Sequence, residues 1–315
     1  MSTWTVYSFE EKKEDLVLFL DDMVRIFSLK NDDVDSYRDS MKEKIYYFDP
    51  KICPSLKSEI VGFLFYYRGE VAGLFYLDKS TPYYGTLFVH VFRDEAIDCI
   101  ASYLYEQDYF NQAQLELSCI QDLDRFLPVF QRLDLTENKR DRMYKYLQHD
   151  QLFDIPSHHY TFRPMRVSDL DVTGSISYLA HQVSRDYYMY VEMNQLDKRV
   201  ALEKKAFSEL YGPVIGPASL IILDGDKIIG NCLVVEVATW GYNHVPWIFD
   251  INILPSYQGK GIGRLFFKHI INELTDMEYQ IMGLAVTADN FAQRLYTKLG
   301  FKVFDTFYEF TKEKE

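Results

Sequence analysis

The residues with the clearest chemical meaning form a loop with three alternating glycines, Gly259, Gly261 and Gly263. The apolar stretch before the loop, residues 247–254, is typical of a strand, and the pattern after it predicts a helix from Ile262. Glycine allows positive φ and a close approach of the backbone to a ligand. The first N–H groups of a helix lack intrahelical partners and lie at the positive end of its dipole. The loop therefore predicts a site for phosphate oxygens.

Two common phosphate-binding motifs do not match this spacing. A dinucleotide-binding G-x-G-x-x-G motif needs a third glycine where this chain has Arg264. A P-loop closes with Gly-Lys-Ser or Gly-Lys-Thr, which the loop lacks. The pattern that fits is Gln258-x-x-Gly261-x-Gly263.

This pattern resembles the pyrophosphate loop of the GNAT superfamily of N-acetyltransferases, which bind acetyl-CoA. Residues 251–255 before the loop resemble the family's strand, and Asn290, Leu295-Tyr296 and Leu299-Gly300-Phe301 resemble its second motif. The resemblance covers roughly residues 160–312. It implies an α/β (α+β) fold with a mixed, largely antiparallel central sheet flanked by helices. It also implies acetyl-CoA as a co-substrate and no metal.

The resemblance assigns roles position by position. Tyr296 matches the general acid that protonates the CoA thiolate, a task that suits a phenol with a pKa of about 10. Asn290 matches the residue that binds the pantetheine amide, and Lys260 is a candidate phosphate contact. Without the motif, Asn290 would equally be an N-cap and Tyr296 a core aromatic residue. The implied cofactor-binding residues are Ile251, Asn252 and Ile253 for the pantetheine arm, Gln258, Gly259, Lys260, Gly261, Ile262 and Gly263 for the pyrophosphate, and Asn290.

The general base is not identified by the resemblance. The candidates are Asp250 on the cofactor strand, Glu236 on the preceding strand and His244 in the loop between them. Asp250 and Asn252 alternate with isoleucines, so in a regular strand their side chains leave the core face, whereas a bulge would reverse this. We rank Asp250 first and Glu236 second. A surface salt bridge is an equally good interpretation of each.

Hydrophobic periodicity predicts the elements that position these residues. In the second half, the predicted helices span 168–188 (with a break near Gly174), 262–274 and 290–299, and the predicted strands span 219–223, 227–237, 247–254, 280–286 and 304–310. Aromatic-rich loops at 186–194, 211–218 and 240–246 are expected to bound the acceptor site.

The first half shows the same order of elements. A helical start in residues 1–50 precedes predicted strands 60–67, 71–77, 86–92, 115–120 and 142–147 and predicted helices 94–105 and 124–133. No glycine occurs from Thr86 to Thr173, and Phe130 stands where the second half has Tyr296. We expect two GNAT-like lobes: residues 1–155, degenerate and without a cofactor loop, and residues 156–315, which are catalytic. The alternative for the first half is an unrelated acidic α/β domain.

Composition excludes several classes of protein. The chain has 315 residues and a net charge of -13, which disfavours nucleic-acid binding because that affinity depends on Lys and Arg. Its apolar runs are far shorter than the ~20 residues of a membrane helix, and an acidic N-terminus argues for a cytoplasmic protein. The four cysteines show neither a CxxC pair nor zinc spacing and are expected to be reduced.

These observations predict a cytoplasmic, acetyl-CoA-dependent N-acetyltransferase. The acetyl group would move to a primary amine of a small molecule, peptide or protein by direct attack in a ternary complex. The alternative is a CoA-binding sensor or interaction module without turnover. The identity of the amine, the acyl chain and the oligomeric state stay open.

Overall fold

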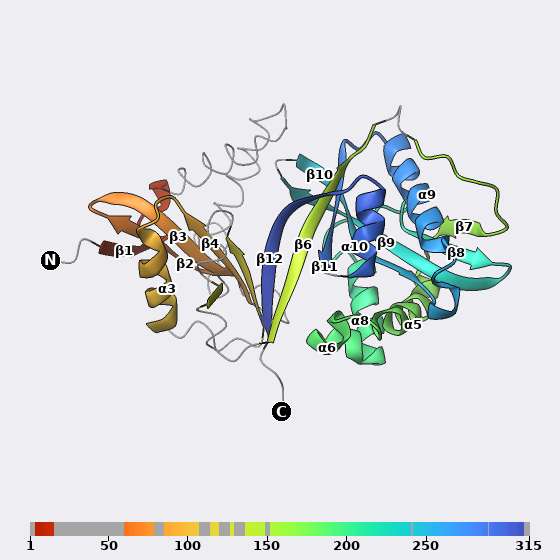
Figure 1. The fold of residues 1–315 in the computed structure, drawn as a ribbon, viewed down its shortest axis with the longest axis horizontal. Helices are drawn as coiled ribbons and strands as arrows, with labels where there is room; N and C mark the ends of the chain where they lie inside the picture. The colour runs from red at the N-terminus through yellow and green to blue at the C-terminus, as the bar shows by residue number, and fades with distance from the viewer. Residues whose placement is uncertain are drawn as a thin grey trace. The chain divides into compact units, whose positions relative to one another are not determined.

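A computed structural model describes residues 4–15, 60–78, 85–106, 114–119, 127–128, 136–148, 152–240, 242–288 and 290–311 (Figure 1). The chain forms two compact units. The first comprises Met1–Arg140, Trp240–Tyr242 and Asp305–Glu315, and the second comprises Asp141–Thr239 and Asn243–Phe304. The division therefore falls within two strands, β6 (Thr136–Tyr146) and β12 (Lys302–Thr311). The expected lobe boundary after residue 155 stays a prediction.

The first unit contains a mixed sheet with the strand order β1-β2-β3-β4-β5-β12. Neighbours from β1 to β4 are antiparallel, β4 and β5 are parallel, and β12 is antiparallel to β5. Helix α3 (Ala96–Glu106) buries Ile100 and Leu104 against Phe65 and Phe75 of the sheet. The strands are β1 (Trp4–Ser8), β2 (Ile60–Tyr67), β3 (Glu70–Asp78), β4 (Gly85–Val91) and β5 (Gln114–Cys119), and a short helix η1 (Lys13–Asp15) follows β1.

The N-terminus departs from the prediction of a helical start. Residues 4–8 form strand β1, which pairs with β2 along its whole length. The reason is local: β-branched and aromatic side chains favour a strand, and β2 offers an open edge for pairing. The predicted amphipathic stripe at 16–26 lies outside the described residues. So does most of the predicted helix 124–133, including Phe130, so its equivalence to Tyr296 stays a prediction.

The second unit contains a mixed sheet with the order β6-β11-β10-β9-β8-β7. Strand β7 is antiparallel to β8, β8 is antiparallel to β9, and β10 is parallel to β11. The strands are β7 (Thr161–Pro164), β8 (Leu220–Asp224), β9 (Lys227–Thr239), β10 (Tyr242–Ile253) and β11 (Ile281–Thr287). The helices are η4 (Val167–Asp169), α5 (Leu170–His181), α6 (Asp186–Met189), α7 (Val191–Asn194), α8 (Leu196–Phe207), η5 (Pro255–Tyr257), α9 (Ile262–Asp276) and α10 (Phe291–Lys298).

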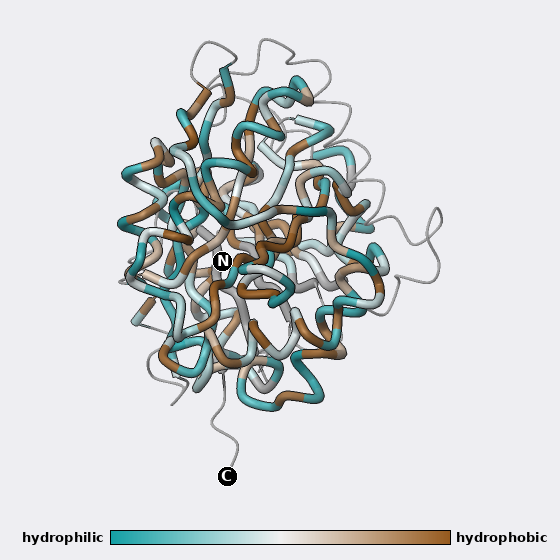
Figure 2. Tube along the Cα trace, turned by 90° about the vertical axis from the view of Figure 1, so that its right-hand side faces the viewer, coloured by the Kyte–Doolittle hydropathy of each residue, from teal (hydrophilic) through white to brown (hydrophobic). Residues whose placement is uncertain are grey.

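Strand β9 shows how the second unit buries both faces of its sheet. Cys232 and Val234 pack in a large core with residues of α9 and α10, whereas Leu233 packs with residues of α5 and α8 on the opposite face. Figure 2, which colours the trace by hydropathy, shows that hydrophobic and hydrophilic residues alternate along the chain. Among the described residues, no helix combines the length and the apolar character needed to cross a membrane. Cys99 and Cys232 are free thiols, and Cys53 lies outside the described residues.

Helix α5 runs through Gly174 without the predicted break. A side chain at this position would come within 2.9 Å of the Val200 Cα atom in α8. The glycine therefore allows close packing of two helices rather than ending one. Helix α8 itself was not predicted, and it supplies two of the residues described next.

Candidate active site

The predicted glycine loop lies between β10 and α9, as the sequence indicated. Gly259 and Gly261 adopt positive φ of 75° and 80°, and Gly261 is the N-cap of α9. Among the described residues, no acceptor is found for the backbone N–H groups from Gly259 to Arg264; the first intrahelical bond runs from Leu265 N–H to the Gly261 carbonyl. The Gln258 side chain donates to the Ile253 carbonyl at 2.8 Å and fixes the loop on the strand end. The loop therefore presents consecutive unpaired donors, the geometry required to bind phosphate oxygens.

The strand before the loop separates from its parallel neighbour. Within the described strands, β10 and β11 pair only at Trp247 with Gly283 and at Ile248 with Leu284. The side-chain alternation slips at the same place: Phe249 and Asp250 both contact residues on the α5–α8 face, while Ile251 packs on the α9 face. This slip is the signature of a bulge. Beyond Ile248, the edge of β10 that faces β11 is therefore available to an extended ligand.

Helix α10 carries the two residues of the second motif. The Asn290 side chain accepts from the Ala292 N–H at 2.9 Å, so Asn290 is the N-cap of α10. Tyr296 is buried between Phe267 and Phe301, and its hydroxyl makes no hydrogen bond to the described residues. Burial, with the nearby Cys232 and Asp250, raises the pKa of Tyr296 well above its usual value. The phenol therefore keeps its proton at neutral pH.

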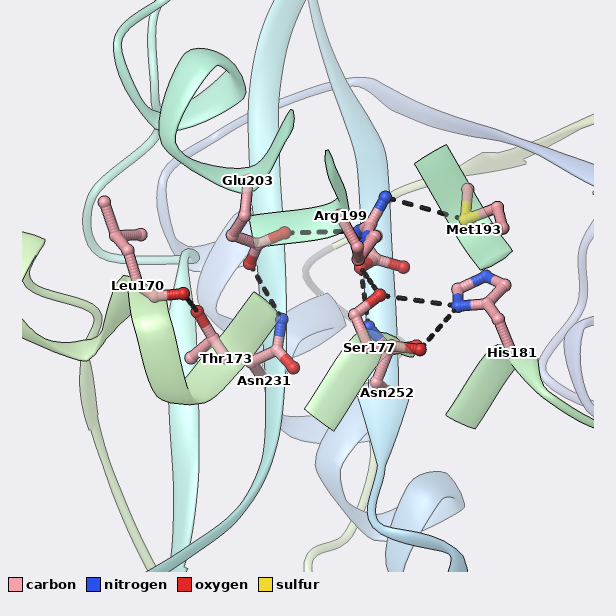
Figure 3. A network of polar contacts seen from close by, with 10 residues as sticks. Leu170, Thr173, Ser177, His181, Met193, Arg199, Glu203, Asn231 and Asn252 are labelled. Atoms are coloured by element: carbon pink, nitrogen blue, oxygen red, sulfur yellow. Dashed lines mark hydrogen bonds and ion pairs between the residues drawn. The ribbon is translucent and has the colours of Figure 1, made fainter. Parts of the chain in front are cut away.

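A buried polar network joins β10 to helices α5 and α8 (Figure 3). Asp250 accepts hydrogen bonds from Ser177 Oγ at 2.7 Å and from Asn252 Nδ2 at 2.6 Å, and it forms an ion pair with Arg199. Arg199 also pairs with Glu203 at 3.2 Å. Asp250 is buried, yet Arg199 and these hydrogen bonds leave its pKa below the usual value. The carboxylate is thus held in its charged form.

Glu236 lies in a different environment. Its half-buried carboxylate contacts His244 Nδ1 at 2.8 Å and accepts from the Tyr279 hydroxyl at 2.8 Å. Burial acts to raise the pKa of Glu236, but the contacts with His244 and Tyr279 outweigh it and leave the pKa lowered. The His244 side chain is 73% exposed, so this carboxylate is linked to solvent through an imidazole.

The structure brings the sequence-predicted residues of the loop, strand and second motif into one unit. Ile251, Asn252 and Ile253 end β10, residues 258–263 form the loop, and Asn290 and Tyr296 lie on α10. Sequence reasoning missed Arg199 and Glu203, which no predicted element contained. Their spacing of four positions was the available signal, since it places both on one face of a helix. No group of His, Cys, Asp and Glu able to hold a metal ion is found in the described part of the chain.

Comparisons with known proteins agree with this geometry. Residues 183–301 match the model of the acetyltransferase (GNAT) family. Over 90 residues the chain is 34% identical to the [ribosomal protein bS18]-alanine N-acetyltransferase of Haemophilus influenzae; this match covers 28% of the chain and 56% of that relative.

Two solved structures share the fold at low sequence identity. A GCN5-related N-acetyltransferase from Sphaerobacter thermophilus has a TM-score of 0.54 at 18% identity, with 80% of each chain covered. A Drosophila protein has a TM-score of 0.51 at 13% identity, with 98% of each chain covered. The family match, the glycine loop and the separating strands agree: residues 183–301 of this chain form a domain of the GNAT acetyltransferase family.

Proposed function

We propose that this protein is an acetyl-CoA-dependent N-acetyltransferase that acts on a primary amine. The observation that carries the proposal is the run of N–H groups from Gly259 to Arg264, for which the described residues offer no acceptor, next to the edge of β10 that is not paired with described residues of β11 beyond Ile248. The loop would bind the pyrophosphate of CoA through these N–H groups. The backbone of residues 251–253 would hold the pantetheine arm as an added strand, and an N–H there would polarise the thioester carbonyl.

The proton transfers follow from the two environments described above. Tyr296 would donate its proton to the CoA thiolate, since the buried phenol is protonated at neutral pH. Of the two candidate bases, Glu236 is the better placed to take the amine proton, because it is partly exposed and linked to His244. Asp250 is buried and paired with Arg199, so it has little tendency to accept a proton.

The acceptor is a small-molecule amine or the amine of a peptide or protein. The name of the Haemophilus relative includes an alanine of a ribosomal protein, so peptides with N-terminal alanine belong in the first set of amines to test. An intact Tyr296 favours turnover over the alternative of a CoA-binding sensor. We further propose that the protein is cytoplasmic and that its first unit is a degenerate GNAT-like lobe. The order of elements in the first unit supports the second point: the hairpin β2–β3 is followed by strand β4, helix α3 and strand β5, which is parallel to β4, and the second unit has the same order in β8 to β11.

Gly261→Asp tests the cofactor site. Open space surrounds Gly261, and aspartate is among the residues that tolerate a positive φ, so the variant should fold. The added carboxylate would meet the pyrophosphate, and calorimetry should show that binding of acetyl-CoA is lost. Gly69→Asp is a matched control, because Gly69 also has positive φ and open surroundings but lies in the first unit. Undiminished binding by a folded Gly261→Asp protein would refute the site.

Tyr296→Phe tests for turnover. A general acid contributes about 10²–10⁴-fold in rate. With an amine that the wild type acetylates, kcat should therefore fall by this order in the variant, while the affinity for acetyl-CoA is retained. Thiol release over a panel of amines measures the rate. If the wild-type protein binds acetyl-CoA but releases no thiol with any amine, the sensor alternative is favoured.

A further inference from the structure

The buried ion pair between Arg199 and Asp250 is not required by the proton transfers proposed above. Arg199 is 1% exposed and Asp250 is 8% exposed, so both charges have been taken out of water. Burying two charges costs about as much as their attraction returns, and well-packed apolar residues often replace such a pair without loss of stability. Stability alone is therefore a weak reason for the pair, and its position in the fold supplies a better one.

The pair lies where β10 leaves β11. The last pairing between these strands is at Ile248, and Asp250 follows two residues later, directly before the segment 251–253. Beyond Ile248, the described residues of β10 and β11 form no further pairs that would hold this edge of β10 in register. Instead, this part of β10 is held from the face of the sheet that α5 and α8 cover. There Asp250 is bound by Ser177 of α5 and Arg199 of α8 (Figure 3).

Both partners of Asp250 are themselves fixed. The Arg199 side chain is held by Glu203 at 3.2 Å and contacts the Met193 sulfur at 3.7 Å. The Ser177 carbonyl lies 2.9 Å from His181 Nδ1 within α5. Because α5 and α8 pack closely at Gly174, the two helices form a single support for the bulge of β10.

We propose that Arg199 is a positioning residue for acetyl transfer: through Asp250 it fixes the backbone of residues 251–253 so that an N–H meets the thioester carbonyl. The inference rests on the proposed function and adds a role for a residue outside the cofactor motifs. It also gives Asp250 a role other than that of a base. Removing Arg199 should then disturb the polarisation of the thioester more than the binding of CoA, because the pyrophosphate loop starts beyond the anchored bulge.

The test uses acetyl-CoA labelled with ¹³C at the thioester carbonyl. In the full-length wild-type protein, the bound carbonyl resonance should differ from that of free acetyl-CoA. In Arg199→Met it should return toward the free value, while the dissociation constant of acetyl-CoA changes by less than about threefold. With an amine that the wild type acetylates, kcat should fall about 100-fold, as expected for a misplaced oxyanion donor. Arg199→Lys retains the charge without the planar fork and should recover part of both signals.

Lys204→Met is the matched control. Lys204 lies on the same helix and pairs with Asp171 at 2.7 Å, but both side chains are more than half exposed. This variant should behave as the wild type. Should Arg199→Met fail to fold because Asp250 is left as a lone buried charge, Arg199→Met combined with Asp250→Asn removes that charge and is measured instead.

Each result decides between defined alternatives. If a folded variant that lacks Arg199 keeps the carbonyl resonance and the kcat of the wild type, the positioning role is overturned and the proposed function stays intact. If the variant loses affinity for acetyl-CoA to the same extent as it loses the shift of the bound carbonyl resonance, the positioning role is also overturned, because Arg199 would then only support the fold. Absence of acetyl-CoA binding by the wild type would instead refute the proposed function itself.

Discussion

Glu203→Gln should remove a pH dependence from the stability of the second unit. Glu203 is fully buried in α8, where its carboxylate contacts Arg199 and accepts from Asn231 Nδ2 at 3.2 Å. Burial raises its pKa from 4.5 to about 7; Arg199 opposes this rise, and the charge of Asp250 adds to it. The network thus contains two carboxylates and one arginine, and a proton on Glu203 balances the charge. The groups that act on it from neighbouring strands and helices are Asp250 on β10, Asn231 on β9 and Thr173 on α5.

The magnitude follows from the difference between the folded and unfolded pKa values. At about 1.4 kcal/mol per pKa unit, a change from 4.5 to about 7 corresponds to about 3 kcal/mol. Because the folded-state pKa is the higher one, this contribution to the free energy of unfolding is complete below about pH 4.5 and is lost as the pH rises through about 7. Glutamine matches the shape of the protonated acid, and its NH₂ group can donate to the Asn231 Oδ1 atom, which has no partner in the described structure.

The assay compares the wild type with Glu203→Gln at about pH 5 and about pH 8. Urea titrations followed by hydrogen exchange in peptides of β9 and β10 report on the second unit by itself. The free energy of unfolding of the wild type should fall relative to the variant by about 2.5 kcal/mol between the two pH values, because part of the contribution is already lost at pH 5. Asp171→Asn, which breaks the exposed pair with Lys204, should keep the wild-type pH dependence. If the free energy of unfolding falls equally in the wild type and in Glu203→Gln between these pH values, Glu203 is ionised over the whole range.

Two further substitutions test individual contacts of the site. Tyr279→Phe removes a hydrogen bond that lowers the pKa of Glu236, so the acidic limb of the pH profile of kcat/KM should move to higher pH; an unmoved limb would exclude Glu236 as the base. Asn290→Ala should cost about 1 kcal/mol through loss of the cap on Ala292 N–H, measured by urea unfolding, whereas Asn290→Asp keeps the cap. If Asn290→Asp binds acetyl-CoA more weakly, Asn290 contacts the pantetheine arm. If binding is unchanged, Asn290 acts only as the N-cap of α10.

The glycine loop could be predicted because its chemistry is contiguous in sequence and belongs to the backbone. The predicted helix 262–274 corresponds to α9 (Ile262–Asp276), and the predicted strand ends at the loop as β10 does. The N-cap role of Asn290, one of its two interpretations, is confirmed. Each of these features depends on residues within a few positions of one another.

The network around Asp250 could not be predicted for the opposite reason. Its members are spread from Thr173 to Asn252, and only folding brings them together. Helix α8 turns Arg199 and Glu203 inward, so charged residues occupy core positions and the apolar period that marks a helix is weakened. The sequence left open whether β10 contains a bulge, because the bulge depends on the contacts of Asp250 with α5, whose bounds were predicted incorrectly, and with α8, which was not predicted.

Strand β6 shows why the second unit needs residues before the predicted boundary at 155. Met143 of β6 and Leu147, which directly follows the strand, belong to the core formed with α9, and the Leu147 N–H donates to the Gln280 carbonyl at 2.9 Å. The Asn272 side chain of α9 also holds both backbone groups of Phe153 at 2.8 Å. Loss of a buried Leu or Met side chain costs about 2–5 kcal/mol each, and a whole domain is stable by only about 5–15 kcal/mol.

A fragment of residues 156–315 should therefore fail to fold cooperatively, whereas one of residues 136–315 should fold. Both fragments contain the glycine loop, α10 and all of β12, so the comparison isolates β6 and the segment after it. Thermal unfolding followed by circular dichroism, with the dispersion of amide NMR signals, distinguishes a folded fragment from an unfolded one. A cooperative transition of the shorter fragment within a few degrees of the longer one would show that the core closes without β6. The contacts of Met143 and Leu147 would then contribute far less than their burial indicates.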